Sequence, residues 1–518
     1  MTVVIDPAFN PVPSLDRKID VAVRTAAQVP DDDAALVVFV SAEGDLPAGL
    51  DGLDREALSA AGFTGKKGQT LALPGDRLRV LVGTGGAMKN AAELRDAVAV
   101  FTRAAAESGS LSVDLSGPLE GSAGGTGLDP RLAAQAAVEG AILARYRYDA
   151  LLSDAKTVQL ERLALTVPEA AVQEAERGLE RGLILSRAAS LARDLANTPP
   201  RHLNAVKFAE VIERLAPQFG LEIEVFDRAA LIELGCGGLL GVNAGSVEEP
   251  RMVKLRYSPK GDASGHLALI GKGIMYDSGG ISLKPSNAMH AAMKLDMMGA
   301  AAVFSSMTAL RDLGVQAAVT GWLMCTDNMP SGSATKLGDV LTIRGGTTVE
   351  VKNTDAEGRL VMADGLVLAT EDRAVAERRP DAIVDIATLT GAAMMALGTR
   401  TAAMLANNDA VAEQLQAAAD STDENIWRLP LDHRYRDQLK SDVADLSNMG
   451  GQYAGAILAA LFLNEFVDGT PWGHLDIAGT MQAESNDLWR SIGSTGFGAR
   501  LLAEFAVGFE APADSETE

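Results

Sequence analysis

The sequence predicts an α/β fold in two domains, a smaller N-terminal α/β domain and a larger C-terminal α/β domain whose mixed central sheet is flanked by helices. Two observations support this prediction. The chain has 518 residues, of which 47% are hydrophobic, so it can build two separate cores. Short runs of β-branched and aliphatic residues alternate with longer helix-like segments, and strands separated by helices are typical of α/β proteins.

The N-terminal part begins with such an alternation. Residues 36–40 and 78–82 are short runs rich in valine and leucine that end at turn-forming residues, so we expect two strands there. A helical pattern covers residues 91–106, and Asn90 directly before it is a suitable N-cap.

A long amphipathic helix is expected over residues 168–197. Pro168 suits a first helical turn, and Pro199 and Pro200 prevent the helix from continuing. We place a domain boundary near residue 170, which gives an N-terminal domain 1–170, a C-terminal domain 171–511 and an acidic tail 512–518 that we expect to be disordered. Apolar residues recur three to five positions apart along the helix, as one buried stripe requires: Val172, Ala175, Leu179, Leu183, Ala188, Leu191 and Leu195.

The C-terminal part alternates in the same way, which predicts a parallel or mixed sheet with functional loops at the strand ends. The expected strands are residues 266–271, 317–325, 340–343, 348–352 and 382–387, and the expected helices are residues 289–310, 360–370, 411–419 and 456–466.

The charge of the chain is strongly acidic. It has 46 Lys and Arg residues against 69 Asp and Glu residues, a formal net charge of −23. Binding to a nucleic-acid backbone needs a cationic face, so we do not expect a nucleic-acid partner. There are two cysteines, Cys236 and Cys325, each in an apolar context and without a Cys-x-x-Cys pair, so we expect buried thiols rather than a zinc-thiolate site.

Neither a secretory signal nor a membrane-spanning segment is recognisable. The first 17 residues lack a basic stretch followed by an apolar core, and no run of about 18 apolar residues occurs. We therefore expect a cytoplasmic protein that does not insert into a membrane.

Three segments place charged side chains among glycines and apolar residues, immediately after an expected strand or inside an expected buried helix. They are residues 271–284, 294–299 and 353–359. Asp296 is the most informative residue, because a lone carboxylate inside a core helix is costly unless a cation compensates it. Asp355 and Glu357 are two positions apart, so in an extended segment both side chains would project to one side.

With Asp277, these residues form a group of four acids that could supply oxygen ligands. Four carboxylates gathered in one place repel one another, and two divalent ions would relieve that repulsion and create a reactive centre for hydrolysis. Each acid taken singly could instead be a cap, a turn former or a solvated group. Two other interpretations stay open: a two-metal phosphoesterase, disfavoured because none of the five histidines lies in these segments, and an acidic binding module without catalysis.

These segments resemble those of a known family. Residues 353–360, Asn-Thr-Asp-Ala-Glu-Gly-Arg-Leu, are similar to the signature of the leucine aminopeptidase (cytosol aminopeptidase) family of two-metal peptidases, and residues 271–284 and 294–301 resemble its two metal-binding segments. Residues 328–332, 338–340, 387–391 and 472–479 agree as well. The resemblance covers roughly residues 170–510; the N-terminal part is similar only in outline.

The resemblance implies a catalytic C-terminal domain that removes N-terminal residues from peptides by means of a water shared between two Mn²⁺ or Zn²⁺ ions. By this resemblance Asp277 and Glu357 bridge the two metals, Lys272 as a neutral amine and Asp296 complete the tighter site, and Asp355 serves the more exchangeable one. The substrate α-amine would bind one metal, which restricts cleavage to the first residue.

Further roles follow from the same resemblance. Lys284 would stabilise the developing oxyanion, and Arg359 would hold a bicarbonate that acts as general base, assisted by the backbone of Ala356, Gly358 and Leu360. The first-residue pocket would involve Met293, Thr388, Leu389 and Gly391. Because methionine lines adaptable apolar pockets, we expect a preference for Leu or Met with broad tolerance.

The family also implies an assembly. Its members form homohexamers, arranged as dimers of trimers, so the resemblance implies the same state for this chain. In that arrangement we expect the N-terminal domain to serve oligomerisation or regulation.

Overall fold

The structure of the chain, a computed structural model, describes residues 9–26, 34–47, 50, 52–120, 127–373, 375 and 377–513. It divides into two compact units. The larger unit comprises Met1–Val12, Leu191–Gln482 and Gly493–Glu518, and the smaller unit comprises Pro13–Ser190 and Ala483–Ile492. Each unit is built on its own sheet with helices against it, so the predicted α/β fold class is confirmed.

The division between the units falls inside a helix. Helix α5, Val172–Asn197, follows a 3-10 turn at Glu169–Ala171, much as the apolar stripe predicted, and contributes residues to both units. The sequence places a boundary near residue 170, at the start of this helix, whereas the contacts divide the chain after Ser190. Of the expected disordered tail, residues 514–518 lie outside the described residues.

The smaller unit is a six-stranded sheet in the order β1-β6-β5-β2-β4-β3, in which every neighbouring pair is parallel except β3 and β4. The two expected strands are β2 and β4, which pair with each other, and Asn90 caps α2 by accepting a hydrogen bond from the Glu93 N–H. The strands are Asp20–Arg24, Ala35–Ser41, Thr70–Leu73, Arg79–Gly85, Ser110–Asp114 and Arg162–Thr166 (β1–β6), and the helices are Pro13–Asp16 (η1), Arg55–Ala60 (α1), Ala91–Ala104 (α2), Ser116–Glu120 (α3) and Pro130–Arg145 (α4).

The larger unit contains a mixed eight-stranded sheet in the order β15-β14-β17-β13-β9-β10-β8-β7. Its centre, β17-β13-β9-β10, is parallel, and antiparallel pairing begins at β14 on one side and at β8 on the other. Its strands are Glu222–Phe226 (β7), Arg251–Tyr257 (β8), His266–Asp277 (β9), Ala318–Asn328 (β10), Ala382–Ala387 (β13), Ala402–Ala406 (β14), Ile426–Arg428 (β15) and Trp472–Asp476 (β17).

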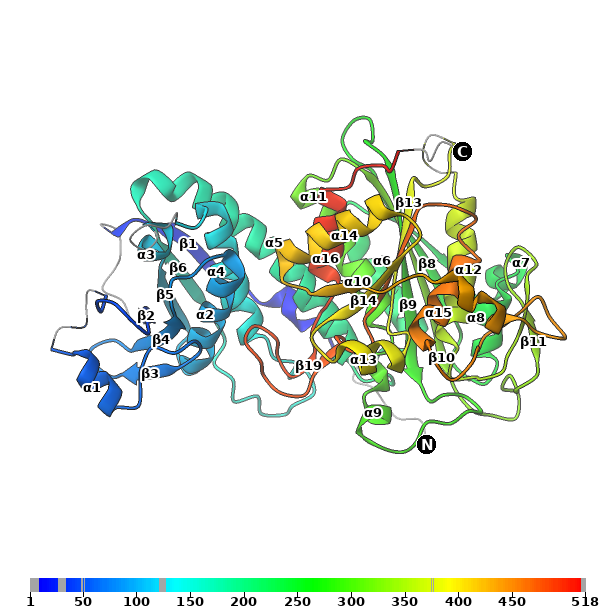
Figure 1. The fold of residues 1–518 in the computed structure, drawn as a ribbon, viewed down its shortest axis with the longest axis horizontal. Helices are drawn as coiled ribbons and strands as arrows, with labels where there is room; N and C mark the ends of the chain where they lie inside the picture. Colours follow the sequence, from blue (N-terminus) through cyan, green and yellow to red (C-terminus); the bar gives the residue numbers. More distant parts are fainter. Residues whose placement is uncertain are drawn as a thin grey trace. The chain divides into compact units, whose positions relative to one another are not determined.

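Helices cover both faces of this sheet (Figure 1). One face carries α6, α10, α11, α14 and α16, and the other carries α8, α12, α13 and α15. The bounds are Ala205–Leu215 (α6), Arg228–Glu233 (α7), Gly237–Asn243 (α8), Ala288–Ala291 (α9), Met298–Met307 (α10), Leu310–Leu313 (α11), Gly358–Glu371 (α12), Gly391–Leu397 (α13), Asp409–Thr422 (α14), Gly455–Asn464 (α15) and Ala499–Val507 (α16), with 3-10 turns at Ala216–Phe219 (η4), Met293–Leu295 (η5) and His433–Leu439 (η6).

Two of the expected strands belong to a different sheet. Residues 340–343 and 348–352 correspond to β11, Val340–Thr342, and β12, Thr348–Glu350, which form a three-stranded sheet with β16, Leu446–Ser447. The last small sheet pairs β18, Gln482–Ala483, with β19, Gly493–Ser494.

The expected continuous helix over residues 289–310 is wrong. The chain there forms α9, the 3-10 turn η5 and then α10, and the interruption lies at Asp296 and Met297. The Asp296 carboxylate accepts a 2.7 Å hydrogen bond from the Thr388 hydroxyl, and its carbonyl accepts a second one from the same hydroxyl at 3.1 Å. This tertiary anchor outweighs the helical preference of the local sequence and turns the carboxylate out of the helix.

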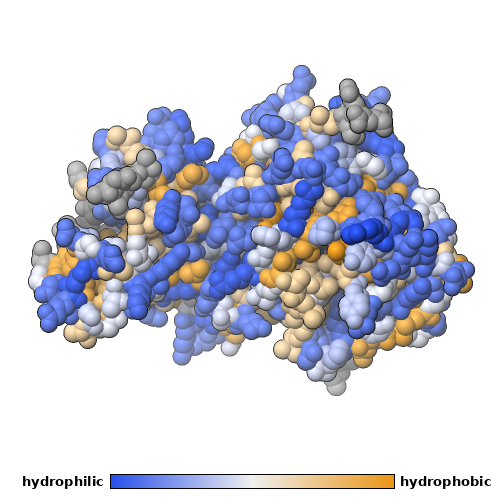
Figure 2. All heavy atoms as spheres, in the orientation of Figure 1, coloured by the Kyte–Doolittle hydropathy of each residue, from blue (hydrophilic) through white to orange (hydrophobic). Residues whose placement is uncertain are grey.

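The surface agrees with the composition. Hydrophilic residues cover most of the face drawn in Figure 2, with apolar residues between them. Both cysteines are buried, as expected. In the part of the chain that the structure describes, no helix combines the length and the apolar character needed to cross a membrane.

Candidate metal centre and substrate cavity

The candidate site lies where four adjacent strands end. Strands β10, β9, β13 and β17 are parallel neighbours, so their carboxyl ends meet at one edge of the sheet, the usual place for a site in α/β folds. Asn328, Asp277 and Asp476 are the last residues of β10, β9 and β17, and Thr388 directly follows β13. The edge therefore gathers polar groups that are far apart in sequence.

Lys272 enters this edge from inside β9. Its ammonium nitrogen lies 2.9 Å from Asp296 Oδ2 and 2.8 Å from Glu357 Oε1, and it donates a 2.9 Å hydrogen bond to the Thr388 carbonyl. A side chain at Gly358 would place its Cβ 2.8 Å from the Lys272 Nζ atom. The glycine at that position therefore allows the lysine to approach the start of α12.

Three acids form the centre of the cluster. Carboxylate oxygens of Asp277, Asp355 and Glu357 all lie within 4.8 Å of one another. Lys284 caps this group, with its Nζ atom 2.8 Å from Asp277 Oδ2 and 2.6 Å from Asp355 Oδ1. The four predicted acids and two predicted lysines therefore meet in one place.

The expected extended conformation at residues 355–357 is wrong. Asp355 lies in a turn, and Glu357 has helical angles, φ −74° and ψ −35°, as the residue before α12. The Asp355 N–H donates to Asn353 Oδ1 at 2.9 Å, a short turn built by the asparagine side chain. The turn and the helix start bring both carboxylates to one side, although not by strand geometry.

The electrostatics of the cluster are unbalanced. Four carboxylates face two ammonium groups. Burial and then the Asp277 charge raise the pKa of Glu357 to about 7, and burial raises the pKa of Asp296 well above its ordinary value. For Lys272, burial favours the neutral form, but the surrounding carboxylates outweigh it and raise its pKa. The two ammonium groups therefore cannot balance the negative charge of the four carboxylates when all of them are ionised.

The donor set fits divalent cations. Carboxylate oxygens with one amine suit hard or borderline ions such as Mn²⁺ and Zn²⁺, and a dication supplies the positive charge that the acids lack. It also competes with the proton on Lys272, which would free the amine as a ligand.

The cluster forms one wall of a cavity of about 230 Å³. The predicted pocket residues Met293, Thr388, Leu389 and Gly391 line it. Methionine is the most frequent apolar residue in the lining, since Met289, Met394 and Met481 join Met293; Lys272, Asp277, Lys284, Asp296, Asp355, Glu357, Thr390 and Ala478 complete it.

Arg359 and the predicted anion loop do not line this cavity. Arg359 is buried and donates a 2.7 Å hydrogen bond to the Asn448 carbonyl, and burial lowers its pKa to about 10, so it stays charged at neutral pH. Arg359, Ala356, Gly358 and Leu360 are not among the lining residues of the cavity.

Three supporting residues were not predicted as site residues. Asn328 donates to Asp277 Oδ1 at 2.8 Å and to the Thr354 carbonyl at 2.9 Å, so it orients the acid. Asn448 accepts from the Lys352 N–H at 2.8 Å and donates to the Asn353 carbonyl at 2.6 Å. No local pattern marks Asn448, whereas Asn328 lies three residues after the expected strand 317–325 and opens a segment that resembles the family, a signal that could have identified it.

Asp476 is the third of these residues and holds the pocket loop. Buried at the end of β17, it accepts hydrogen bonds from the N–H groups of Leu389 at 3.1 Å and Thr390 at 3.3 Å. Its other oxygen accepts from the Thr390 hydroxyl at 2.6 Å. Asp476 therefore holds residues 389 and 390 of the loop, while Thr388 is held by Asp296 and Lys272.

Models of two domains match the chain. The model of the cytosol aminopeptidase family catalytic domain matches residues 190–503, and that of the family's N-terminal domain matches residues 37–155. A probable cytosol aminopeptidase of Chlorobaculum tepidum is 41% identical over 487 residues, 92% of this chain and 93% of the relative. One of Streptomyces avermitilis is 40% identical over 510 residues, 94% and 96% of the two chains.

Solved structures agree. The bottromycin maturation enzyme BotP in complex with Mn is 39% identical, with a TM-score of 0.81 over 92% of this chain and 99% of that one. A mutant of tomato leucine aminopeptidase is 29% identical, with a TM-score of 0.82 over 95% and 96%. The chain therefore belongs to the cytosol aminopeptidase family and is a metal-dependent peptidase that hydrolyses peptides at their N-terminus.

Proposed function

We propose that this chain is a two-metal aminopeptidase that prefers an N-terminal Leu or Met and tolerates other residues. The observation that carries the proposal is the convergence of four carboxylates, Lys272 and Lys284 on the wall of a methionine-lined cavity. The oxygen-rich donors suit paired dications, and the apolar lining suits one aliphatic side chain.

Five residues would hold two divalent ions, Mn²⁺ or Zn²⁺: Lys272, Asp277, Asp296, Asp355 and Glu357. Bound there, the ions would supply Lewis acidity and lower the pKa of water, which is the chemistry that amide hydrolysis needs at neutral pH. The contacts of Thr388 with Asp296 and of Asn328 with Asp277 support this role, because groups that hold a ligand's orientation are needed at metal sites.

Lys284 would stabilise the negative charge that develops on the scissile carbonyl oxygen. Its partly buried ammonium lies at the cavity wall, and the nearby carboxylates outweigh burial and raise its pKa, so it is charged at neutral pH. A fixed cation is most effective where the substrate displaces water.

Arg359 would hold a bicarbonate that supplies the general base, with the backbone of Ala356, Gly358 and Leu360 around the start of α12. Three features support an anion there: the buried guanidinium, its Nε atom without a hydrogen bond to any described residue, and the N-terminus of a 14-residue helix.

The first-residue pocket would be formed by Met293, Thr388, Leu389 and Gly391. Four methionines line the cavity, and their flexible thioethers adapt to different aliphatic side chains, which supports a Leu or Met preference. The Leu389 carbonyl would accept a hydrogen bond from the substrate amide.

The test of this proposal compares two peptides that differ only at the N-terminus. We expect release of leucine from Leu-Gly-Gly in the presence of Mn²⁺, and no cleavage of N-acetyl-Leu-Gly-Gly, because a free α-amine is required. Mass spectrometry of the products distinguishes the outcomes. Cleavage of the acetylated peptide, or cleavage at its second bond, would contradict an aminopeptidase.

Met293 offers a test of the pocket. Its side chain is buried in the lining, so Met293→Ala removes apolar contacts with the first residue. We expect kcat/KM for leucine p-nitroanilide to fall roughly tenfold, which corresponds to about 1.4 kcal/mol. Met395→Ala is the matched control, since Met395 is 87% exposed and does not line the cavity. Equal kinetics of the two variants would exclude Met293 from the pocket.

Asp476 offers a test of the loop. In Asp476→Asn an amide NH₂ replaces either the oxygen that accepts from the N–H groups of Leu389 and Thr390 or the one that accepts from the Thr390 hydroxyl. We expect KM for leucine p-nitroanilide to rise about tenfold, with a smaller change in kcat, because the loop orients the substrate. The control is Asp381→Asn, whose carboxylate accepts from the His266 N–H at the opposite end of the sheet. A change in kcat alone would argue against this role.

We also propose that the chain forms a homohexamer, built as a dimer of trimers. We propose a cytoplasmic location as well, and the name of the cytosol aminopeptidase family supports that location. Exposed apolar side chains in the larger unit support an assembly, among them Ile281, Leu283, Leu337 and Tyr453. Light scattering coupled to gel filtration would measure the mass, and a monomer at micromolar concentration would contradict the hexamer. In the same assembly, the N-terminal domain would serve oligomerisation or regulation.

A further inference from the structure

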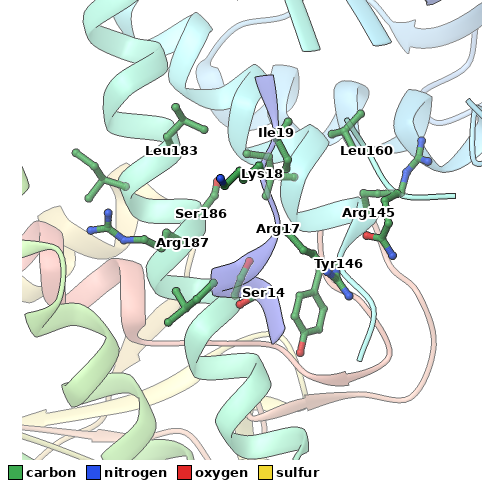
Figure 3. Close-up of a pocket in the computed structure, with 15 residues that line it drawn as sticks. Ser14, Arg17, Lys18, Ile19, Arg145, Tyr146, Leu160, Leu183, Ser186 and Arg187 are labelled. Atoms are coloured by element: carbon green, nitrogen blue, oxygen red, sulfur yellow. The ribbon is translucent and has the colours of Figure 1, made fainter. Parts of the chain in front are cut away.

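The smaller unit contains a cavity of about 370 Å³ (Figure 3). Cavities of this size bind small molecules in many proteins, where the usual range is about 300–1,000 Å³. All of its lining residues belong to the smaller unit, whereas the candidate metal centre is lined by residues of the larger unit. The residues come from the segment before β1, the end of α4, the segment before β6, and α5.

Part of the wall is apolar. Ile19, Ile142, Leu160, Leu183 and Ile184 line the cavity. In Figure 3 Ile19 lies between Leu183 on α5 and Leu160 on the opposite side. This wall suits an aliphatic body that would be removed from water on binding.

Four of the other lining residues are cationic. Arg17, Lys18, Arg145 and Arg187 line the cavity, and no acidic residue does. This contrasts with the chain as a whole, in which acidic residues outnumber basic ones by 69 to 46. A locally cationic cavity on an acidic protein selects an anionic ligand.

Two of these cations have no carboxylate at ion-pair distance among the described residues. The guanidinium of Arg145 is already engaged by the chain, because its two terminal nitrogens donate to the backbone carbonyls of Thr102, Ala105, Ala106, Ser108 and Val158. Lys18 is exposed at the cavity and forms no ion pair within the described ranges. Arg17, in contrast, pairs with Asp149 at 3.2 Å.

A buried hydroxyl also faces the cavity. Ser186 on α5 is fully buried, and its Oγ atom has no hydrogen-bond partner in the described part of the chain. Buried hydroxyl groups are normally paired, so an unpaired one in a cavity wall indicates a polar atom supplied by a ligand.

We propose that this cavity binds a small organic carboxylate with an aliphatic body. The carboxylate would lie near Lys18 and accept a hydrogen bond from Ser186, and the aliphatic body would pack on Leu160, Leu183 and their apolar neighbours. The proposal is independent of the peptidase function, since it concerns binding in the other unit.

The experiment titrates the full, Mn²⁺-loaded chain with sodium octanoate by isothermal titration calorimetry. We expect saturable binding and a roughly tenfold weaker affinity in Lys18→Glu, which reverses one rim charge on an exposed side chain. Leu183→Trp, which fills the cavity from its apolar side, should abolish binding. Lys89→Glu, at an exposed lysine of the same unit outside the cavity, should bind as the unchanged chain does.

Several outcomes would overturn the proposal. Octanol binding as tightly as octanoate would show that charge plays no part, and inorganic phosphate binding in place of octanoate would show that the apolar wall plays none. Octanoate binding that survives Lys18→Glu and Leu183→Trp but is lost in Asp296→Asn would assign the carboxylate to the metal centre. An absence of octanoate binding would exclude the site for this ligand class.

Discussion

Lys284→Ala is expected to lower kcat for leucine p-nitroanilide by about 10²–10³, the usual cost of one group that stabilises an oxyanion. The reason is that the Lys284 ammonium lies at the wall of the cavity beside the acid cluster, where it can face the scissile carbonyl. KM should change much less, because the charge on the oxygen develops only in the transition state.

This prediction needs a measure of metal content. Lys284 also pairs with Asp277 and Asp355, so its loss could alter the acids themselves. Elemental analysis should find the same metal content in Lys284→Ala as in the unchanged chain. Lys336→Ala, at an exposed lysine of the same unit, is the matched control. Near-normal turnover of Lys284→Ala with full metal content would refute the oxyanion role.

Asp296→Asn is expected to remove the more tightly bound divalent ion and to lower kcat/KM by roughly 10³, about 4 kcal/mol of transition-state stabilisation. The amide is a weaker ligand than a carboxylate but has nearly the same shape, and its oxygen can still accept from Thr388. The fold should therefore survive, which circular dichroism would verify.

The measurement is metal content per chain after dialysis, together with activity before and after added Mn²⁺. A chelator should abolish activity of the unchanged chain, and Mn²⁺ should restore it. Asp312→Asn, a helical acid outside the cavity in the same unit, should retain both metal and activity. If Asp296→Asn retained both as well, Asp296 would not be a ligand.

Much of the local structure could be predicted from the sequence. The strand at Ala382–Ala387, the helix capped by Asn90 and the long helix α5 follow from short-range patterns, because their apolar spacing and caps are local properties. The acids and lysines of the cluster could be selected because charged residues are unusual beside buried strands.

Other features could not be predicted in this way. The break at Asp296 depends on the Thr388 hydroxyl, which is 92 positions away, and the turn at Asp355 lies against Asn448. The methionine lining joins Met289 and Met293 to Met394 and Met481 from distant segments. Such contacts form only when segments distant in sequence pack together in the folded chain.

The sequence by itself determined the α/β class, the acidic charge and which residue types could bind a divalent ion, since these depend on composition and on neighbours along the chain. Only the tertiary structure decided which side chains support the cluster, how the pocket loop is held by Asp476, and that a cationic cavity exists in the smaller unit. The physical reason is that burial and hydrogen bonding between distant segments outweigh local preferences of the chain.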